Sequence, residues 1–116
     1  MIDSSDQLET LNPYVSRETI KKLSDYRDSI ISAKFNLVSK KDKDHIWIRH
    51  FHDSLRLRKF FEKNSKKIKI LDIGSGAGLP GLPLSMVLDN DLFEFVLCES
   101  NNKKANFIQD CCDQLD

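Results

Sequence analysis

The chain has 116 residues, of which 40% are hydrophobic and 31% charged, and its 18 basic side chains balance its 18 acidic ones. Such a composition excludes a disordered chain and is typical of one small globular domain. No apolar stretch approaches the roughly 20 residues that cross a bilayer, and the first ten residues lack the basic and apolar pattern of a signal peptide. The three cysteines, Cys98, Cys111 and Cys112, have neither disulfide-framework nor metal-site spacing. We therefore expect a reduced, cytoplasmic setting with no membrane and no metal.

Helical patterns dominate the first 66 residues. A turn at residues 12–14 precedes Ser16, which is a good N-terminal helix cap. Apolar residues then recur every three or four positions, which predicts an amphipathic helix ending between residues 36 and 39. They are Ile20, Leu23, Tyr26, Ile30, Ala33 and Leu37. A charged link at residues 40–44 leads to a second helical pattern, and a polar break follows at residues 64–67. The apolar residues on one side of this second pattern are Ile48, Phe51, Leu55 and Phe60.

Strands alternate with helices in the remainder of the chain. Residues 69–73 form a short apolar run closed by glycine, which predicts a buried parallel strand. A helix is predicted at residues 82–88 and a second strand at residues 93–98, and this order is typical of a right-handed parallel unit. A last helix begins at Asn102. Its inward residues are Ala105, Ile108, Cys111, Cys112 and Leu115. Because two strands cannot protect their own edges, we expect the front half of a larger doubly wound domain or a shortened version of one.

All four glycines of the chain fall within eight positions, directly after the first predicted strand. A glycine loop between a strand and a helix lets bare main chain approach a nucleotide. Residues 76–81 match the dinucleotide pattern G-x-G-x-x-G, and Glu99 follows 18 residues later. Residues 72–78 instead match the Asp-x-Gly-x-Gly-x-Gly loop of S-adenosylmethionine-dependent methyltransferases, where an acid such as Glu99 would accept from two ribose hydroxyls. Asp72 and Pro80 favour the methyl donor; a dinucleotide, or a tight turn with no ligand, is the alternative.

Two blocks of the sequence carry more specific motifs. The first joins residues 35–39 (FNLVS) to residues 48–55 (IRHFHDSL), and the second is residues 71–85 (LDIGSGAGLPGLPLS). These blocks resemble the "NLTS", "RHxxDS" and "GxGLPGxPL" motifs of the ribosomal RNA small-subunit methyltransferase G family (RsmG, also called GidB). The resemblance covers the front portion of that family.

The resemblance implies a fold, an activity and partners. The implied fold is α/β, a Rossmann-like class I S-adenosylmethionine-dependent methyltransferase fold, incomplete, with an N-terminal helical segment at residues 1–66 and the first βαβα part of the cofactor-binding domain at residues 67–116. The implied activity is methylation of guanine N7 in 16S ribosomal RNA, with the RNA or the 30S particle as partner. The alternatives are a non-catalytic cofactor- or RNA-binding remnant of the family and a nicotinamide-dependent oxidoreductase.

Two sets of site residues are predicted. The cofactor-binding set is Asp72, Gly74, Ser75, Gly76, Gly78, Leu79 and Glu99. The RNA-binding set is Arg49, His50, Arg56, Arg58 and Lys59. The last three begin a basic tract that holds seven Lys and Arg residues against one acid. Alternatively, the tract is a solvated helix face, and Arg49 forms an ion pair with Asp53 four residues later. No catalytic residue is assigned, because guanine N7 already presents a lone pair and needs no general base.

Overall fold

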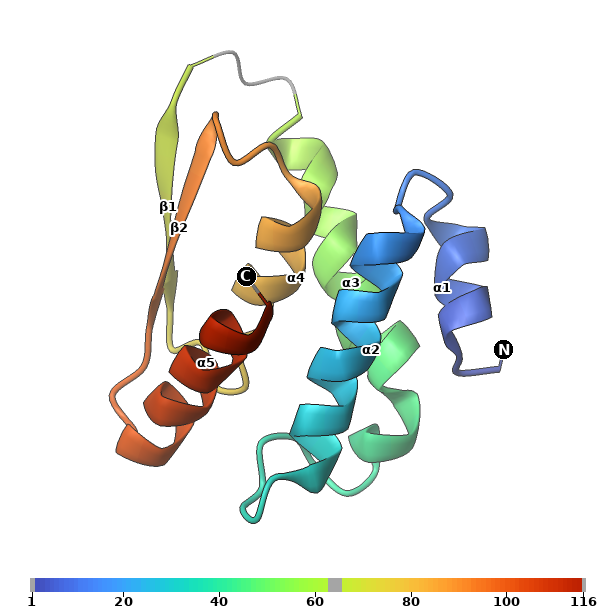
Figure 1. Ribbon diagram of the computed structural model, residues 1–116, viewed down its shortest axis with the longest axis vertical. Coiled ribbons are helices and arrows are strands. Elements are labelled where there is room, and N and C mark those ends of the chain that lie inside the picture. The colour runs from blue at the N-terminus through green and yellow to red at the C-terminus, as the bar shows by residue number, and fades with distance from the viewer. Residues whose placement is uncertain (1, 63–65, 116) are drawn as a thin grey trace.

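The computed structural model describes residues 2–62 and 66–115, so Lys63 and the first two residues of the polar break predicted at residues 64–67 lie outside the described residues. Its elements, in chain order, are α1 (Ser5–Leu11), α2 (Arg17–Ser32), η1 (Asp42–His45), η2 (Ile46–His52), α3 (Asp53–Leu55), η3 (Arg56–Phe60), β1 (Ile68–Ile73), α4 (Gly81–Val87), β2 (Phe93–Cys98) and α5 (Asn102–Leu115). In Figure 1 the helices lie beside the two strands, with α4 and α5 nearer the sheet and α1 outermost. The chain is therefore a small mixed α/β domain.

The two predicted strands are confirmed, and they are parallel. The register runs from Ile68 opposite Phe93 to Ile73 opposite Cys98, and α4 provides the crossover between the strands. The prediction that the first strand is buried is wrong, because Leu71 is 57% and Ile73 81% exposed. Among the described residues, helices cover only one face of this sheet, so the residues of β1 that point the other way face solvent.

Helix α2 begins as predicted and ends earlier than predicted. The Ser16 Oγ accepts a hydrogen bond from the backbone N–H of Thr19 at 3.1 Å, which confirms the cap. The backbone turns extended at Ala33, so the predicted end at residues 36–39 is wrong. Leu37 still packs against the core, but from a loop. The apolar spacing thus continues beyond the helix because a loop residue fills the same core.

Residues 42–60 form one helical segment whose winding changes along its length. It begins as a 3₁₀-helix, widens to a π-helix in η2, and tightens again to a 3₁₀-helix in η3. Phe51 and Leu55 are buried as predicted, whereas Phe60 is 70% exposed, so its predicted inward position is wrong. An apolar spacing that fits 3.6 residues per turn no longer places residues on one side when the winding tightens.

Helix α1 was not predicted, although the sequence carries a signal for it. The Ser4 Oγ accepts from the backbone N–H of Gln7 at 3.1 Å, and a serine followed three residues later by glutamine is a known start pattern. Leu8 of α1 is fully buried. The start of the chain therefore contributes to the core.

One hydrophobic core joins the helices before β1 to those after it. Buried residues of α1, α2, η2 and α3 pack with Leu82 of α4 and with Ile108 and Cys111 of α5. The inward face predicted for α5 is confirmed by the burial of Ile108 and Cys111. Within residues 2–62 and 66–115, no helix has the length and apolar character needed to span a membrane.

Candidate cofactor-binding site

The glycine loop lies at the carboxyl end of the two-stranded sheet. Gly74, Gly76 and Gly78 have φ angles of +76°, +60° and +100°, a region that side chains rarely adopt. The backbone N–H groups of Gly74 and Ser75 donate to the carbonyl of Cys98, at 2.8 and 3.1 Å. These bonds hold the loop against the last residue of β2, next to Glu99.

The two sides of the loop have different surroundings. A Cβ added at Gly74 or Gly76 would meet no atom within 4 Å. A Cβ at Gly78 would lie 2.6 Å from the side chain of Leu82 and 2.9 Å from the hydroxyl of Tyr26. Gly74 and Gly76 therefore present bare main chain to open space, while Gly78 is a packing position.

Glu99 is hydrogen-bonded to the open side of the loop. One carboxylate oxygen accepts the backbone N–H of Gly76 at 2.7 Å, and the other accepts that of Asn101 at 2.9 Å. The N–H groups of Asn101 and Gly76 lower the pKa of Glu99. The side chain is therefore an ionised acceptor at neutral pH. Each oxygen retains a further acceptor position, because a carboxylate offers about four.

Asp72 and Ser75 form hydrogen bonds that shape the loop. One carboxylate oxygen of Asp72 accepts the backbone N–H of Gly81 at 2.9 Å, where α4 begins. The buried Ser75 hydroxyl donates to the carbonyl of Asp72 at 2.9 Å. Leu79 is half-buried against the main core. The backbone N–H groups of Gly78 and Leu79 donate to the carbonyl of Ser75. Hydrogen bonds thus join six of the seven predicted residues to another member of the set, Gly74 being the exception.

Tyr26 of α2 supports the loop from behind. Its hydroxyl donates to the carbonyl of Ala77 at 2.5 Å, and its ring stacks on Phe51 with centroids 5.3 Å apart. The side chain is fully buried, and burial raises the pKa of the hydroxyl well above its usual range, so it remains a donor. The apolar spacing predicts Tyr26 only as a core residue. The available signal was a tyrosine among apolar positions, since a buried tyrosine hydroxyl requires a partner.

Three residues of the predicted RNA-binding set come together. Arg56, Arg58 and Lys59 line a cavity of about 490 Å³ that also includes Tyr14 and His52. The Arg58 guanidinium lies 3.4 Å from the centre of the Tyr14 ring. Figure 1 places η3 and the loop before α2 near the end of the molecule where β1 begins, whereas the glycine loop follows the other end of β1. The basic cavity is thus remote from the loop.

Arg49 and His50 lie apart from that cavity and share Asp42. The Arg49 guanidinium is 3.4 Å and the His50 Nε2 3.3 Å from its carboxylate, the latter without hydrogen-bond geometry. The Ser39 hydroxyl, and then Arg49 and His50, lower the pKa of Asp42. The alternative pairing of Arg49 with Asp53 is wrong, because the wide winding of η2 breaks the four-residue alignment and Asp53 instead pairs with Arg56 at 3.7 Å.

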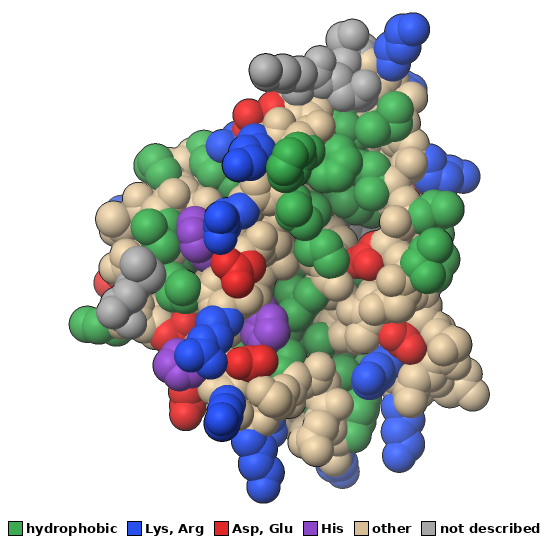
Figure 2. Space-filling model, turned by 180° about the vertical axis from the view of Figure 1, so that it is seen from behind, with side chains coloured by type: hydrophobic (Ala, Val, Ile, Leu, Met, Phe, Trp, Pro, Cys, Tyr) green, Lys and Arg blue, Asp and Glu red, His purple; other side chains and the backbone are tan. Residues whose placement is uncertain are grey.

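Charged groups and histidines share one face of the helical part. Figure 2 shows histidines beside basic and acidic side chains there, with hydrophobic side chains above them. In the part of the chain that the structure describes, no three His, Cys, Asp or Glu side chains are grouped as metal ligands. The arrangement offers hydrogen-bonding and ionic contacts to a ligand.

The chain is similar to one protein family and to individual members of it. The family model described as "rRNA small subunit methyltransferase G" matches residues 19–116. A protein of that name from Oenococcus oeni is 40% identical over 84 residues, which are 72% of this chain and 34% of the relative. One from Cereibacter sphaeroides is 38% identical over 111 residues, which are 92% of this chain and 51% of the relative. A third, from Gluconobacter oxydans, is 37% identical over 98 residues.

The matched proteins are longer than this chain. It covers 34%, 48% and 51% of the three relatives, so it spans between about a third and about a half of their length. The matched region contains the glycine loop, Glu99 and every predicted RNA-binding residue.

Proposed function

This chain belongs to the rRNA small subunit methyltransferase G family, and we propose that it serves the transfer of a methyl group from S-adenosylmethionine to N7 of a guanine in 16S ribosomal RNA. The observation that carries the proposal is the bare main chain at Gly74 and Gly76 beside the ionised carboxylate of Glu99. An adenosine-containing group needs a close approach to main chain and an acceptor for its ribose hydroxyls, and both lie within one short loop.

The residues present fit the cofactor. Gly74 and Gly76 give the adenosyl and methionine parts a surface without side chains, and Leu79 adds an apolar contact. Glu99 receives the ribose hydroxyls with the acceptor positions that Gly76 and Asn101 leave free. The remaining members of the predicted set, Asp72, Ser75 and Gly78, act by holding the loop in shape.

The proposed methyl transfer requires no general base from the protein. When bound, S-adenosylmethionine supplies an electrophilic methyl group. Guanine N7 offers its lone pair without losing a proton, so the chain's share is to orient the two groups and exclude water. Correct positioning accounts for up to roughly 7–11 kcal/mol of a barrier in well-oriented systems.

The proposed fold is the Rossmann-like class I methyltransferase fold, present in part. Residues 67–116 provide its first βαβα unit, and residues 1–66 support the loop from behind through Tyr26. Such folds bind ligands at the carboxyl ends of parallel strands, and the glycine loop has this position relative to β1 and β2.

The proposed partner is small-subunit ribosomal RNA, free or in the 30S particle. Arg56, Arg58 and Lys59 share one cavity with the aromatic ring of Tyr14, which suits a phosphate chain with a stacked base. Arg49 and His50 are proposed as a second contact. Affinity that rests on phosphate contacts falls as salt concentration rises.

Calorimetry of the 116-residue chain with S-adenosylmethionine and with NAD tests the cofactor. Binding of the methyl donor and no binding of NAD is the expected result. A preference for NAD would overturn the proposal in favour of an oxidoreductase.

A non-catalytic binding module is the second candidate function. The open face of β1 favours it, since residues such as Leu71 and Ile73 lack a covering layer within the described residues. Methyl transfer from labelled S-adenosylmethionine to small subunits that lack the modification separates the two. Incorporation by this chain eliminates the binding module; cofactor binding without incorporation supports it.

A further inference from the structure

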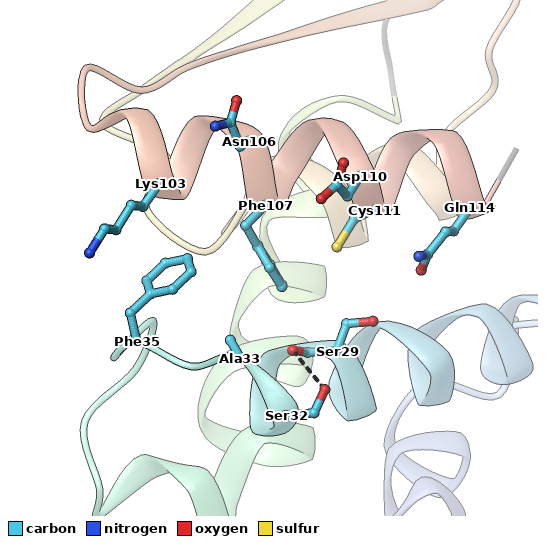
Figure 3. Close-up of a pocket in the computed structure, with 10 residues that line it drawn as sticks. All are labelled: Ser29, Ser32, Ala33, Phe35, Lys103, Asn106, Phe107, Asp110, Cys111 and Gln114. Atoms are coloured by element: carbon cyan, nitrogen blue, oxygen red, sulfur yellow. Dashed lines mark hydrogen bonds between the residues drawn. The ribbon is translucent and has the colours of Figure 1, made fainter.

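Two hollows in the surface differ in the charge of the side chains around them. The groove between α2 and α5 has a volume of about 400 Å³, and its one lysine and one aspartate leave its lining formally neutral (Figure 3). The basic cavity beside Tyr14, of about 490 Å³, is lined by three cations, Arg56, Arg58 and Lys59. Among the described residues that line it there is no acid. The basic cavity is therefore the hollow suited to an anion.

Two of these cations are also paired with acids. The Arg56 guanidinium lies 3.7 Å from a carboxylate oxygen of Asp53, and the Arg58 guanidinium forms an ion pair with Glu62. Neither acid lines the cavity, and ion pairs between exposed side chains are weak. Because a guanidinium carries several N–H donors in a fork, both arginines retain donors for an anion in the cavity.

A buried asparagine just after α1 contacts the histidine of the basic cavity. Asn12 is 5% exposed, and its side-chain nitrogen donates to the carbonyl of Leu8 at 3.0 Å. The same nitrogen lies 3.0 Å from Nδ1 of His52. The opposite orientation of the amide would place its oxygen against the Leu8 carbonyl, and two acceptors have no hydrogen to share. The Leu8 carbonyl therefore fixes the amide with its nitrogen toward His52.

The fixed amide also decides which nitrogen of the His52 ring carries the proton. An amide NH₂ group is only a donor, so Nδ1 of His52 is the acceptor and the proton of the neutral ring is on Nε2. Within the described residues, the structure gives this ring no other hydrogen-bond partner. His52 is half-buried and lines the basic cavity. Its Nε2–H is therefore a donor available to a ligand there.

We propose that the basic cavity binds a phosphate group of the RNA substrate, that His52 donates to this phosphate through Nε2, and that Asn12 is the positioning residue of the ring. The inference rests on the proposed function, since it takes RNA as the substrate. The cations attract the phosphate, and the neutral ring adds a directional donor without adding charge. The Tyr14 ring, 40% exposed at the same cavity, favours RNA over an acidic peptide, because an adjoining base can stack on it.

Imidazole ¹⁵N NMR of the labelled 116-residue chain at neutral pH tests the arrangement of the ring. His52 is expected in the Nε2–H form, and addition of a short unpaired RNA should shift its Nε2 signal. Asn12→Ala removes the amide, so the Nδ1–H form should appear beside the Nε2–H form. A residue with a merely structural role would not change this ratio. If Asn12→Ala fails to fold by circular dichroism, the variants of His52 decide.

Affinity for the same RNA at several salt concentrations separates the neutral donor from the cations. His52→Phe keeps a ring without the donor, so affinity should fall about tenfold, as for loss of a hydrogen bond to a charged group, with an unchanged salt dependence. His52→Gln should restore most of the loss, because the glutamine nitrogen can take the position of Nε2. Lys59→Gln should weaken binding and lower the salt slope by about one. His45→Phe is the matched control and should bind like the parent chain, because His45 is exposed and lies outside the cavity.

Several outcomes would overturn the proposal. They are a proton on Nδ1 of His52 in the parent chain, equal affinities of His52→Phe and His45→Phe, and a salt slope that falls in His52→Phe as it does in Lys59→Gln. Inorganic phosphate that binds as tightly as the RNA would assign the cavity to a free phosphate. Displacement of the RNA by a polyglutamate peptide would assign it to a protein partner.

Calorimetry with S-adenosylmethionine on the same samples separates the two hypotheses. Failure of the cofactor to bind, with the expected RNA results, contradicts the proposed function alone. Cofactor binding together with RNA binding that does not depend on His52 contradicts the inference about the basic cavity alone.

Discussion

The first and second halves of the glycine loop use glycine for different physical reasons. At Gly74 and Gly76 a side chain would extend into open space, so only the backbone angle and a ligand demand its absence. At Gly78 and Gly81 a side chain would collide with protein, with Leu82 and Tyr26 in one case and with Asp72 in the other. The first half is thus open, as the proposed binding role requires, and the second half is packed as part of the fold. A repeated residue type in one motif does not have one role.

The largest expected effect is that of Gly78→Val on stability. The new side chain would overlap Leu82 and Tyr26 at an unfavourable backbone angle, so we expect a loss of about 2–5 kcal/mol in the free energy of unfolding. Urea denaturation measures it. Gly74→Val is the matched control, because Gly74 also has a positive φ angle but a side chain there would meet no atom. An equal loss in both variants would show that the overlap at residue 78 does not matter.

Gly76→Val tests the binding half. The side chain would occupy the space proposed for the cofactor, so affinity for S-adenosylmethionine should fall at least roughly a hundredfold, while the free energy of unfolding falls by only about 1–2 kcal/mol. Calorimetry and urea denaturation on the same preparation report both values. Retained affinity would show that the cofactor does not lie against this residue.

Tyr26→Phe tests the hydrogen bond that supports the packed half of the loop. The ring stays against Phe51, but the buried carbonyl of Ala77 loses its donor, which should cost about 1–3 kcal/mol of stability. The other tyrosine provides the control: Tyr14→Phe keeps its ring under Arg58 and should change stability little. Cofactor affinity of the Tyr26 variant should fall less than that of Gly76→Val.

Glu99→Gln tests the acceptor beside the open half. The amide keeps one oxygen for a backbone N–H but replaces the other with a donor, so affinity for S-adenosylmethionine should drop roughly tenfold, as for loss of a hydrogen bond to a charged group. Glu94→Gln, in the exposed part of β2, is the control and should leave affinity unchanged. Equal affinities in the two variants would remove Glu99 from the site.

The smallest expected effect is that of pH. Because the N–H groups of Asn101 and Gly76 lower the pKa of Glu99, its charged form is present at neutral pH and is lost only as pH falls below the usual carboxyl range. Cofactor affinity should therefore be constant from about pH 8 to about pH 5. Calorimetry across this range checks it, and a midpoint near pH 6 would assign control to another group.

The sequence predicted the parts of the molecule that depend on neighbouring residues. Both strands, the cap at Ser16 and the spacing of the glycine loop from Glu99 follow from local pattern, and all are present. The partner of Tyr26 could not be predicted, because it lies 51 residues away in the chain. The same holds for Arg49, whose partner depends on a change of helical winding that no residue spacing reveals.

Burial of β1 was mispredicted for a related reason. Its apolar run is typical of a strand covered on both faces, and the described residues supply a layer on one face only. The same run would fit a sheet with helices on both sides. The sequence pattern of a strand shows which of its faces are apolar. Whether those faces are buried depends on the layers that the rest of the chain packs against them.

The outer face of β1 has a practical consequence for anyone handling the protein. Leu71 and Ile73 form an exposed hydrophobic stripe on β1. Within the described sheet, β1 pairs with β2 along one edge and is unpaired along the other. Such a stripe promotes self-association. Concentrated solutions of the protein are therefore expected to aggregate on storage, and glycerol or mild detergent should slow the aggregation.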